Sequence, residues 1–292
     1  MSGPIHVVLA FDDNFWAPAY ATMRGICLSS RRRSEITFHL LHLELDPGHR
    51  KALEAITTEF GAQLDFIALH EREEFRAMAA RLPEVRGGTR PIVYARLMID
   101  LLLPAEVTRF VFADCDMLFK APVEFLVDLD LGEKSIAAVP DIYGLRFMGK
   151  RDLKQNRELF DTADPYFNAG LMVVDRQAWR RADPLAMLDR LIETDRLRRL
   201  YHDQDVLNLT FKNDWLILDS RWNYIDPTGS AQSLNPHVLH YTGKRKPWLP
   251  RAPVAFARLY RRVMTRPVYD QYRRERRARN WRRFGRRLMV WR

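Results

Sequence analysis

Seven short apolar runs, rich in valine, isoleucine, leucine and phenylalanine, recur along the first 220 residues of the chain. They are IHVVLAF, EITFHLLHL, QLDFIAL, RFVFA, SIAAVP, GLMVVD and WLILDS. Stretches with helical spacing lie between them, for example Leu185, Leu188 and Ile192 after the helix-start signal Asp183-Pro184. Strands that alternate with helices are typical of a mixed, mostly parallel sheet with helices on both faces. The predicted fold class is therefore α/β.

The length of the chain and its few cysteines indicate its domain size and its compartment. A chain of 292 residues, 47% of them hydrophobic, suffices for one large α/β domain or for a domain with an appendage. Cys27 and Cys115 are too few for a disulfide framework and lack C-x-x-C spacing. The N-terminus lacks a secretory pattern, and no apolar run approaches about 18 residues. These features predict a cytoplasmic protein that does not span a membrane.

Acidic residues follow four of the apolar runs directly. These four segments read VVLAFDDN, FVFADCD, AAVPD and LMVVD. Because ligands of open α/β sheets sit beyond the carboxyl ends of the strands, several of these acids should meet at one edge. Clustered carboxylates repel one another unless a cation or hydrogen-bond donors lie among them. We therefore expect a metal site or a polyhydroxylated ligand at this edge.

D-x-D pairs are weak evidence on their own, because a chain of this length holds on the order of one by chance. The three pairs are Asp114 with Asp116, Asp128 with Asp130, and Asp203 with Asp205. The 128/130 pair lies in a predicted loop or helix end with no histidine beside it and is interpreted as solvated loop acids. The 114/116 pair follows a strand directly, so alternation would turn both carboxylates to one side and Cys115 to the other.

Two carboxylates in that arrangement suit a hard divalent cation with open positions for phosphate oxygens, such as Mg²⁺ or Mn²⁺. An imidazole ligand would favour Mn²⁺. The segment HVLHYTGKRKPW offers His237 and His240 close to Gly243 and Lys246. From spacing alone, each histidine is equally well explained as a packed or surface imidazole.

An ordered set of motifs resembles family 8 glycosyltransferases, a retaining group with the GT-A fold that includes bacterial lipopolysaccharide galactosyl- and glucosyltransferases. From residue 5 to residue 248 the matching stretches are VVLAFDDNF, YARLMI, FVFADCDMLF, AAVPD, YFNAGLMVVD, HDQDVLN and HYTGKRKPW. The resemblance implies a GT-A domain over residues 1–250. It also implies transfer of a hexose from a UDP-sugar to a cell-envelope glycan or lipid-linked acceptor.

The resemblance also implies roles for individual residues. The metal ligands would be Asp114, Asp116 and His240, with Mn²⁺ as the cofactor and Mg²⁺ as the alternative. The donor contacts would be Ala10, Asp12 and Asn14 for uracil and ribose, Arg96 for the sugar and diphosphate, Asp114 and Cys115, and Gly243 and Lys246 for the diphosphate. Residues around the transferred sugar would be Asp141, Asn168, Asp203 and Gln204, with Gln204 near the anomeric carbon. The polar segment 144–164 is expected to help form the acceptor side.

Several of these residues have structural alternatives. Asp12 and Asp13 could cap the helix that follows them, and Asp203 could be an N-cap of its own helix. Asp205 is expected to be structural, and Cys115 to be a small inward filler. For the chemistry, a cation and Lys246 could stabilise the charge that develops on the leaving UDP. A covalent intermediate and a front-face substitution both remain open.

The positive charge of the chain lies in its last part. Residues 251–292 hold 15 arginines, no lysine and two acids, a net charge of +13, whereas the first 250 residues carry −3. Trp281, Phe284, Leu288 and Trp291 fall on one side of a helix with arginines around them. This pattern favours an anionic membrane surface as the partner of 251–292, peripheral on the inner face, over nucleic acid. The alternative is a solvated tail or a helix packed on the domain.

Two other functions compete with sugar transfer. The strand followed by D-x-D also resembles locally the opening of phosphotransferases of the haloacid dehalogenase type, in which Asp114 would be the nucleophile and Asp116 the acid and base. That class usually has Thr or Val where this chain has Leu118. A polyanion-binding module driven by the tail is the non-enzymatic alternative.

Overall fold

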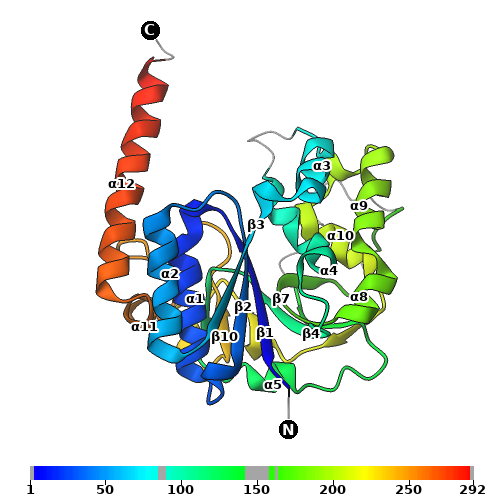
Figure 1. Ribbon diagram of the computed structural model, residues 1–292, viewed down its shortest axis with the longest axis horizontal. Helices are drawn as coiled ribbons and strands as arrows, with labels where there is room; N and C mark the ends of the chain where they lie inside the picture. Colours follow the sequence, from blue (N-terminus) through cyan, green and yellow to red (C-terminus); the bar gives the residue numbers. More distant parts are fainter. Residues whose placement is uncertain (1–2, 85–89, 142–157, 162–163, 290–292) are drawn as a thin grey trace.

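The computed structural model describes residues 3–84, 90–141, 158–161 and 164–289, with side chains described up to residue 282. A large central sheet separates two groups of helices (Figure 1). The α/β class with a mixed, mostly parallel sheet is confirmed.

The central sheet has seven strands in the order β3-β2-β1-β4-β7-β6-β8. Strand β7 runs antiparallel to its neighbours β4 and β6, and the other neighbouring pairs are parallel. Each strand coincides with one of the seven predicted apolar runs. Their bounds are β1 Ile5–Phe11, β2 Ile36–His42, β3 Gln63–Ala68, β4 Arg109–Ala113, β6 Ile136–Pro140, β7 Phe167–Asp175 and β8 Trp215–Ile217.

Helices cover both faces because apolar side chains alternate across the central strands. Val7 and Leu9 of β1 face one apolar core, whereas Val8 faces the other. Helices α1 and α2 cover the first face, and α3, α8, α9 and α10 lie on the second (Figure 1). The helix bounds are α1 Trp16–Ser29, α2 Pro47–Phe60, α3 Glu73–Arg81, α4 Ile99–Leu102, α5 Glu124–Val127, α8 Arg176–Ala182, α9 Pro184–Glu193 and α10 His202–Thr210. The predicted start of α9 is confirmed, because the Asp183 side chain accepts a hydrogen bond from the Ala186 amide.

A second, smaller sheet, absent from the sequence prediction, brings distant segments together. Its strands are β5 Met117–Phe119, β9 Tyr224–Ile225 and β10 Val238–His240, in the order β5-β10-β9. In the antiparallel pairing of β10 with β5, His240 lies opposite Met117. This register places the imidazole beside the residue that precedes β5, which is Asp116.

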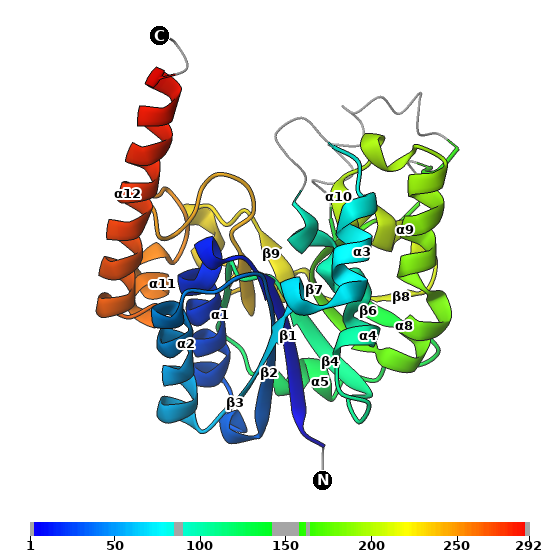
Figure 2. The same ribbon diagram turned by 45° about the horizontal axis from the view of Figure 1, so that its top comes forward.

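The last two described helices pack on the domain, the second of them only through its first part. Helices α11, Ala257–Val263, and α12, Arg266–Met289, follow each other. Tyr260 and Tyr272 belong to one apolar cluster with Trp16 of α1 and Trp248. Beyond this cluster α12 extends past the rest of the molecule (Figure 2). The domain boundary at residue 250 stays a prediction.

Candidate active site

The predicted metal ligands converge at the end of β4. Asp114 follows that strand directly, Asp116 precedes β5, and His240 ends β10. One ligand atom from each residue lies within 4.8 Å of the others. Nε2 of His240 is 3.2 Å from Oδ1 of Asp116 and 3.5 Å from Oδ2 of Asp114. The Asp114 side chain remains 28% exposed, so the group is open to a ligand from solvent.

The charges of this group depend on one another. Burial acts to lower the pKa of His240, but the facing carboxylates of Asp116 and Asp114 outweigh burial and raise the pKa to about 9. Burial acts to raise the pKa of Asp116, yet the Lys246 ammonium and the His240 imidazole hold it well below its usual range. The carboxylate is therefore ionised at neutral pH, as a metal ligand must be.

Gly170 of β7 leaves the space that the group needs. A Cβ added at this position would lie 2.3 Å from Cε1 of His240, 2.8 Å from Oδ2 of Asp114 and 2.9 Å from Oδ1 of Asn168. No side chain larger than hydrogen fits without moving these atoms. Two carboxylates and an imidazole brought together in this way fit a divalent cation.

Arg96 holds one side of the metal group. It comes from the 3-10 segment Pro91–Met98 and is buried over the Phe112 ring. Its guanidinium lies 2.8 Å from Oδ1 of Asp114 and 2.7 Å from Oδ2 of Asp203, and it donates to the Ala169 carbonyl at 2.6 Å. The arginine thereby connects β4, α10 and β7. The fold thus brings Arg96, Asp114 and Asp203 into contact, whereas their roles toward a donor stay predictions.

Lys246, in the loop after β10, contacts the group of three predicted metal ligands through the Asp116 carboxylate. Its ammonium lies 2.5 Å from Oδ2 of Asp116 and also donates to the Tyr241 carbonyl. Gly243, three residues earlier, has φ +67°, a left-handed conformation that favours glycine. The loop after β10 therefore carries both predicted diphosphate contacts, with Lys246 directed to the carboxylate.

A second, buried polar group contains three of the four residues predicted around the transferred sugar, Asp141, Asn168 and Gln204. The Asn168 amide donates to Oδ2 of Asp141 at 3.0 Å and to Oε1 of Gln204 at 3.2 Å. Gln204 in turn donates to Oδ2 of Asp141 at 3.0 Å and to the Tyr166 hydroxyl at 3.1 Å. Asp205 accepts from that hydroxyl at 2.6 Å, in agreement with its predicted structural role.

Asn223, which sequence reasoning missed, joins the two groups. Its Oδ1 lies 3.0 Å from Nδ1 of His240, and its Nδ2 donates to Oδ1 of Asn168 at 2.9 Å. The side chain is 1% exposed. Asn223 stands in the segment RWNYID, where no local pattern marks it.

The residues predicted for the nucleoside lie at the end of β1. Cys115 is buried, and its Sγ lies 3.6 Å from the Ala10 carbonyl, which fits its expected role as an inward filler. Asp12 accepts from the Asn14 amide at 3.0 Å and caps the 3-10 turn before α1. Asn14 is exposed. Asp12 thus caps the turn that leads into α1 and not α1 itself, whose N-cap residue Phe15 makes no side-chain capping bond. Nucleoside contact stays a prediction.

The other capping alternatives have different outcomes. Asp13 does not cap α1: its Oδ1 lies 2.7 Å from Nδ1 of His49 and accepts from the Asp46 amide. Asp203 is not an N-cap, because α10 begins at His202 after Tyr201. The Asp128 and Asp130 pair is exposed, as expected for solvated acids.

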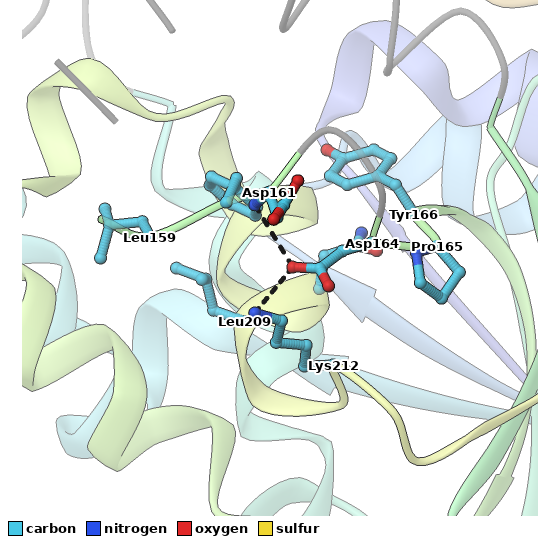
Figure 3. Close-up of a pocket in the computed structure, with 9 residues that line it drawn as sticks. Leu159, Asp161, Asp164, Pro165, Tyr166, Leu209 and Lys212 are labelled. Atoms are coloured by element: carbon cyan, nitrogen blue, oxygen red, sulfur yellow. Dashed lines mark hydrogen bonds and ion pairs between the residues drawn. The ribbon is translucent and has the colours of Figure 1, made fainter. Parts of the chain in front are cut away.

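A pocket near α10 adjoins the second polar group through Tyr166, whose hydroxyl accepts a hydrogen bond from Gln204. It lies among residues 159–161, 164–166, 208, 209 and 212 (Figure 3). Asp164 accepts there from the Asp161 amide and pairs with Lys212 at 2.7 Å. None of the residues predicted for the metal, the donor or the transferred sugar lines this pocket, so we do not assign the donor to it. Residues 159–161 and 164 of the expected acceptor segment do line it. Most of the expected acceptor segment, 144–164, lies outside the described residues.

Comparison with known proteins identifies the class of this site. The model of the family described as glycosyl transferase family 8 matches residues 6–252. The chain belongs to glycosyl transferase family 8. The matched segment includes the group of Asp114, Asp116 and His240 and the buried group of Asp141, Asn168 and Gln204.

Relatives across the family agree with this assignment. General stress protein A of Bacillus subtilis is 26% identical over 261 residues, which cover 84% of this chain and 87% of that protein. The lipopolysaccharide 1,2-glucosyltransferase of Escherichia coli is 25% identical over 272 residues, 88% of this chain and 77% of that protein. The crystal structure of the galactosyltransferase LgtC with donor and acceptor sugar analogs matches with a TM-score of 0.74 and 26% identity, covering 89% of this chain and 95% of that chain.

The phosphotransferase alternative is wrong. The family match covers the whole segment that would have to form such an enzyme, and the fold is that of a glycosyltransferase. The Asp114 carboxylate, the nucleophile of that hypothesis, is held by the Arg96 guanidinium and faces His240. The local likeness of one strand and one D-x-D pair was not specific enough to distinguish the two classes.

Proposed function

We propose that this family 8 member transfers a hexose, galactose or glucose, from a UDP-sugar to a cell-envelope glycan or lipid-linked acceptor with retention of configuration. The observation that carries the proposal is the grouping of Asp114, Asp116 and His240 within 4.8 Å, flanked by the cations of Arg96 and Lys246. Such a group suits the metal-bound diphosphate of a sugar nucleotide better than an uncharged ligand.

Asp114, Asp116 and His240 would hold the cation. One imidazole beside two carboxylates favours Mn²⁺, with Mg²⁺ as the alternative. The cation, when bound, would neutralise negative charge on the departing diphosphate. Lys246 lies at the same carboxylate and would add a positive charge on the leaving-group side.

The buried group would position the transferred sugar. Asp141, Asn168 and Gln204 hold one another through hydrogen bonds of 3.0 to 3.2 Å, so their orientations are fixed before the donor arrives. We infer that Gln204 lies near the anomeric carbon and that Arg96 and Asp203 bind the sugar hydroxyls or the diphosphate. Fixed dipoles of this kind support charge at the reacting centre without reorganising during the reaction.

We infer that the acceptor belongs to the cell envelope and that the protein works at the inner face of the membrane. The similarity to a lipopolysaccharide 1,2-glucosyltransferase of Escherichia coli and a lipopolysaccharide 1,3-galactosyltransferase of Salmonella typhimurium supports this acceptor class. The 15 arginines of residues 251–292 support attraction to a membrane of anionic lipids. Each basic residue near such a surface contributes about 1 kcal/mol of binding free energy. Among the described residues, no helix is long and apolar enough to cross a bilayer.

The test is a hydrolysis screen of UDP-galactose, UDP-glucose and other UDP-sugars with and without Mn²⁺. We expect slow, metal-dependent cleavage of one hexose donor, and its loss in the variant Asp114→Asn/Asp116→Asn. The exposed pair offers a matched control, Asp128→Asn/Asp130→Asn, which removes the same charges away from the site. Undiminished cleavage by the first variant would overturn the metal assignment.

A further inference from the structure

A second pocket lies between the loop after β10 and one face of α12. It is lined by Trp248 and Pro250 of the loop and by Tyr272, Arg273, Arg276, Arg277 and Asn280 of the helix. Counted from Arg273, the arginines and Asn280 stand at i, i+3, i+4 and i+7, so they share one face of the helix. None of the residues assigned to metal, donor or sugar lines this pocket.

The pocket concentrates positive charge without a counter-charge. Its lining has three guanidinium groups and no acid, and no described acidic side chain forms an ion pair with any of the three. The two acids of α12 are engaged elsewhere, Asp270 with Arg266 at 3.6 Å and Glu275 with His49 at 3.0 Å. Like charges at i and i+4 destabilise a helix, so an anion between them would stabilise it.

Arg273 supplies an independent indication of a ligand. Its Nε is buried and has no hydrogen-bond partner among the described residues. A buried guanidinium N–H without an acceptor destabilises the folded protein. An anion in the pocket would accept this hydrogen bond as well as neutralise the charge.

An aromatic wall fixes the pocket beside the candidate active site. Trp248 is 5% exposed and meets the Tyr272 ring edge-on, with centroids 6.3 Å apart. Nζ of Lys246, which pairs with Asp116, lies 5.8 Å from the centroid of the same indole. The indole therefore contacts both the pocket and the lysine proposed for the donor diphosphate.

We propose that this pocket binds a phosphate group other than those of the donor. Guanidinium groups pair with phosphate oxygens two at a time, and three of them around one rigid wall match a tetrahedral dianion. The phosphate comes either from a lipid headgroup or from a phosphorylated molecule in solution. This site stands independently of the proposed hexose transfer, because it involves no residue of the metal or sugar groups.

The first test titrates inorganic phosphate into the full chain by calorimetry. Arg273→Gln/Arg276→Gln should bind phosphate about tenfold more weakly than the natural protein. The control Arg274→Gln/Arg282→Gln removes the same charge from two exposed positions of α12 and should bind within about twofold. The titration is repeated with UDP and Mg²⁺ present, and phosphate binding should persist.

The second test separates the two sources. The same variants are sedimented with vesicles of phosphatidylglycerol and phosphatidylcholine, and with vesicles of phosphatidylcholine alone. Weaker binding of the pocket variant than of the control to the anionic vesicles assigns the site to a lipid headgroup. Equal binding to vesicles, with the calorimetric difference preserved, assigns it to a soluble phosphate. Equal behaviour of the two variants in both tests, or displacement of phosphate by UDP, overturns the proposal.

Discussion

Nδ1 of His240 lies 3.0 Å from Oδ1 of Asn223, while Nε2 of the same ring faces the carboxylates of Asp116 and Asp114. An amide oxygen only accepts hydrogen bonds, so this arrangement keeps a proton on Nδ1. With its pKa raised to about 9, His240 also carries a proton on Nε2 at neutral pH and directs it at the carboxylates. A cation bound there would take the place of that proton and meet the Nε2 lone pair. Asn223 thereby selects both the tautomer and the orientation of the ring.

Removing this amide should weaken metal binding. In Asn223→Ala we expect the apparent affinity for Mn²⁺ to fall about tenfold, because the ring loses the partner that orients it. The measurement is donor hydrolysis as a function of Mn²⁺ concentration. Asn213→Ala, at an exposed asparagine, is the control and should leave the curve unchanged. An unaltered Mn²⁺ requirement in the first variant would contradict the orienting role.

Gly170→Ala should prevent Asp114, Asp116 and His240 from binding a metal. The cause would be the contacts of the added methyl group, because the backbone at residue 170 does not have the left-handed conformation that favours glycine. The added methyl would lie 2.3 Å from Cε1 of His240 and 2.8 Å from Oδ2 of Asp114, so one ligand must move. We expect loss of metal-dependent hydrolysis and loss of the stabilisation that Mn²⁺ confers in thermal unfolding. Gly229→Ala has no atom within 4 Å of its new methyl and serves as the control. Retained stabilisation by Mn²⁺ would show that the group tolerates a side chain at residue 170.

The large sheet was predictable because its strands lie in apolar runs, and the central ones, such as Ile5–Phe11, are largely buried. The small sheet was not, because β5, β9 and β10 have two or three residues each, too few to display a period. That sheet nevertheless sets the register that brings His240 to Asp116. The prediction of His240 as a ligand therefore came from resemblance to a family and not from a local pattern.

The residues of the site also fall into those that a local sequence rule predicts and those that only the fold reveals. Asp114 and Asp116 could be found because they end a strand, where a local rule applies. Asn223 and Gly170 act only through contacts made across the fold, the first with His240 and the second by leaving space. Such residues carry no signal in one sequence, since any asparagine or glycine looks the same before the chain folds.

Arg96 is expected to be essential for stability as well as for activity. In Arg96→Met the carboxylates of Asp114 and Asp203 lose their common cation in a buried setting, at a cost of about 3 kcal/mol in the free energy of unfolding. Urea denaturation measures this loss. Adding Asp203→Asn should recover part of it, because one of the uncompensated charges is then gone. A double variant as unstable as the sum of the two single variants would contradict the coupling.

The attachment of α12 to the body should weaken as pH rises. His49 stacks on Trp16 and lies 2.7 Å from Oδ1 of Asp13 and 3.0 Å from Oε1 of Glu275. Burial acts to lower the pKa of His49, but its two carboxylate partners outweigh burial and raise it above the usual 6.5. Because the pKa is higher in the folded state, the stabilisation is complete below pH 6.5 and is lost as pH rises through the folded pKa.

Glu275→Gln isolates this contribution. Thermal unfolding between about pH 6 and pH 9 should show the natural protein most stable relative to the variant at the acidic end, with the difference shrinking as His49 loses its proton. Glu59→Gln is the control: Glu59 pairs with Arg24, which stays charged over this range, so its difference should not vary with pH. A Glu275→Gln difference that stays constant across the range would mean that the neutral imidazole holds α12 as firmly as the charged one.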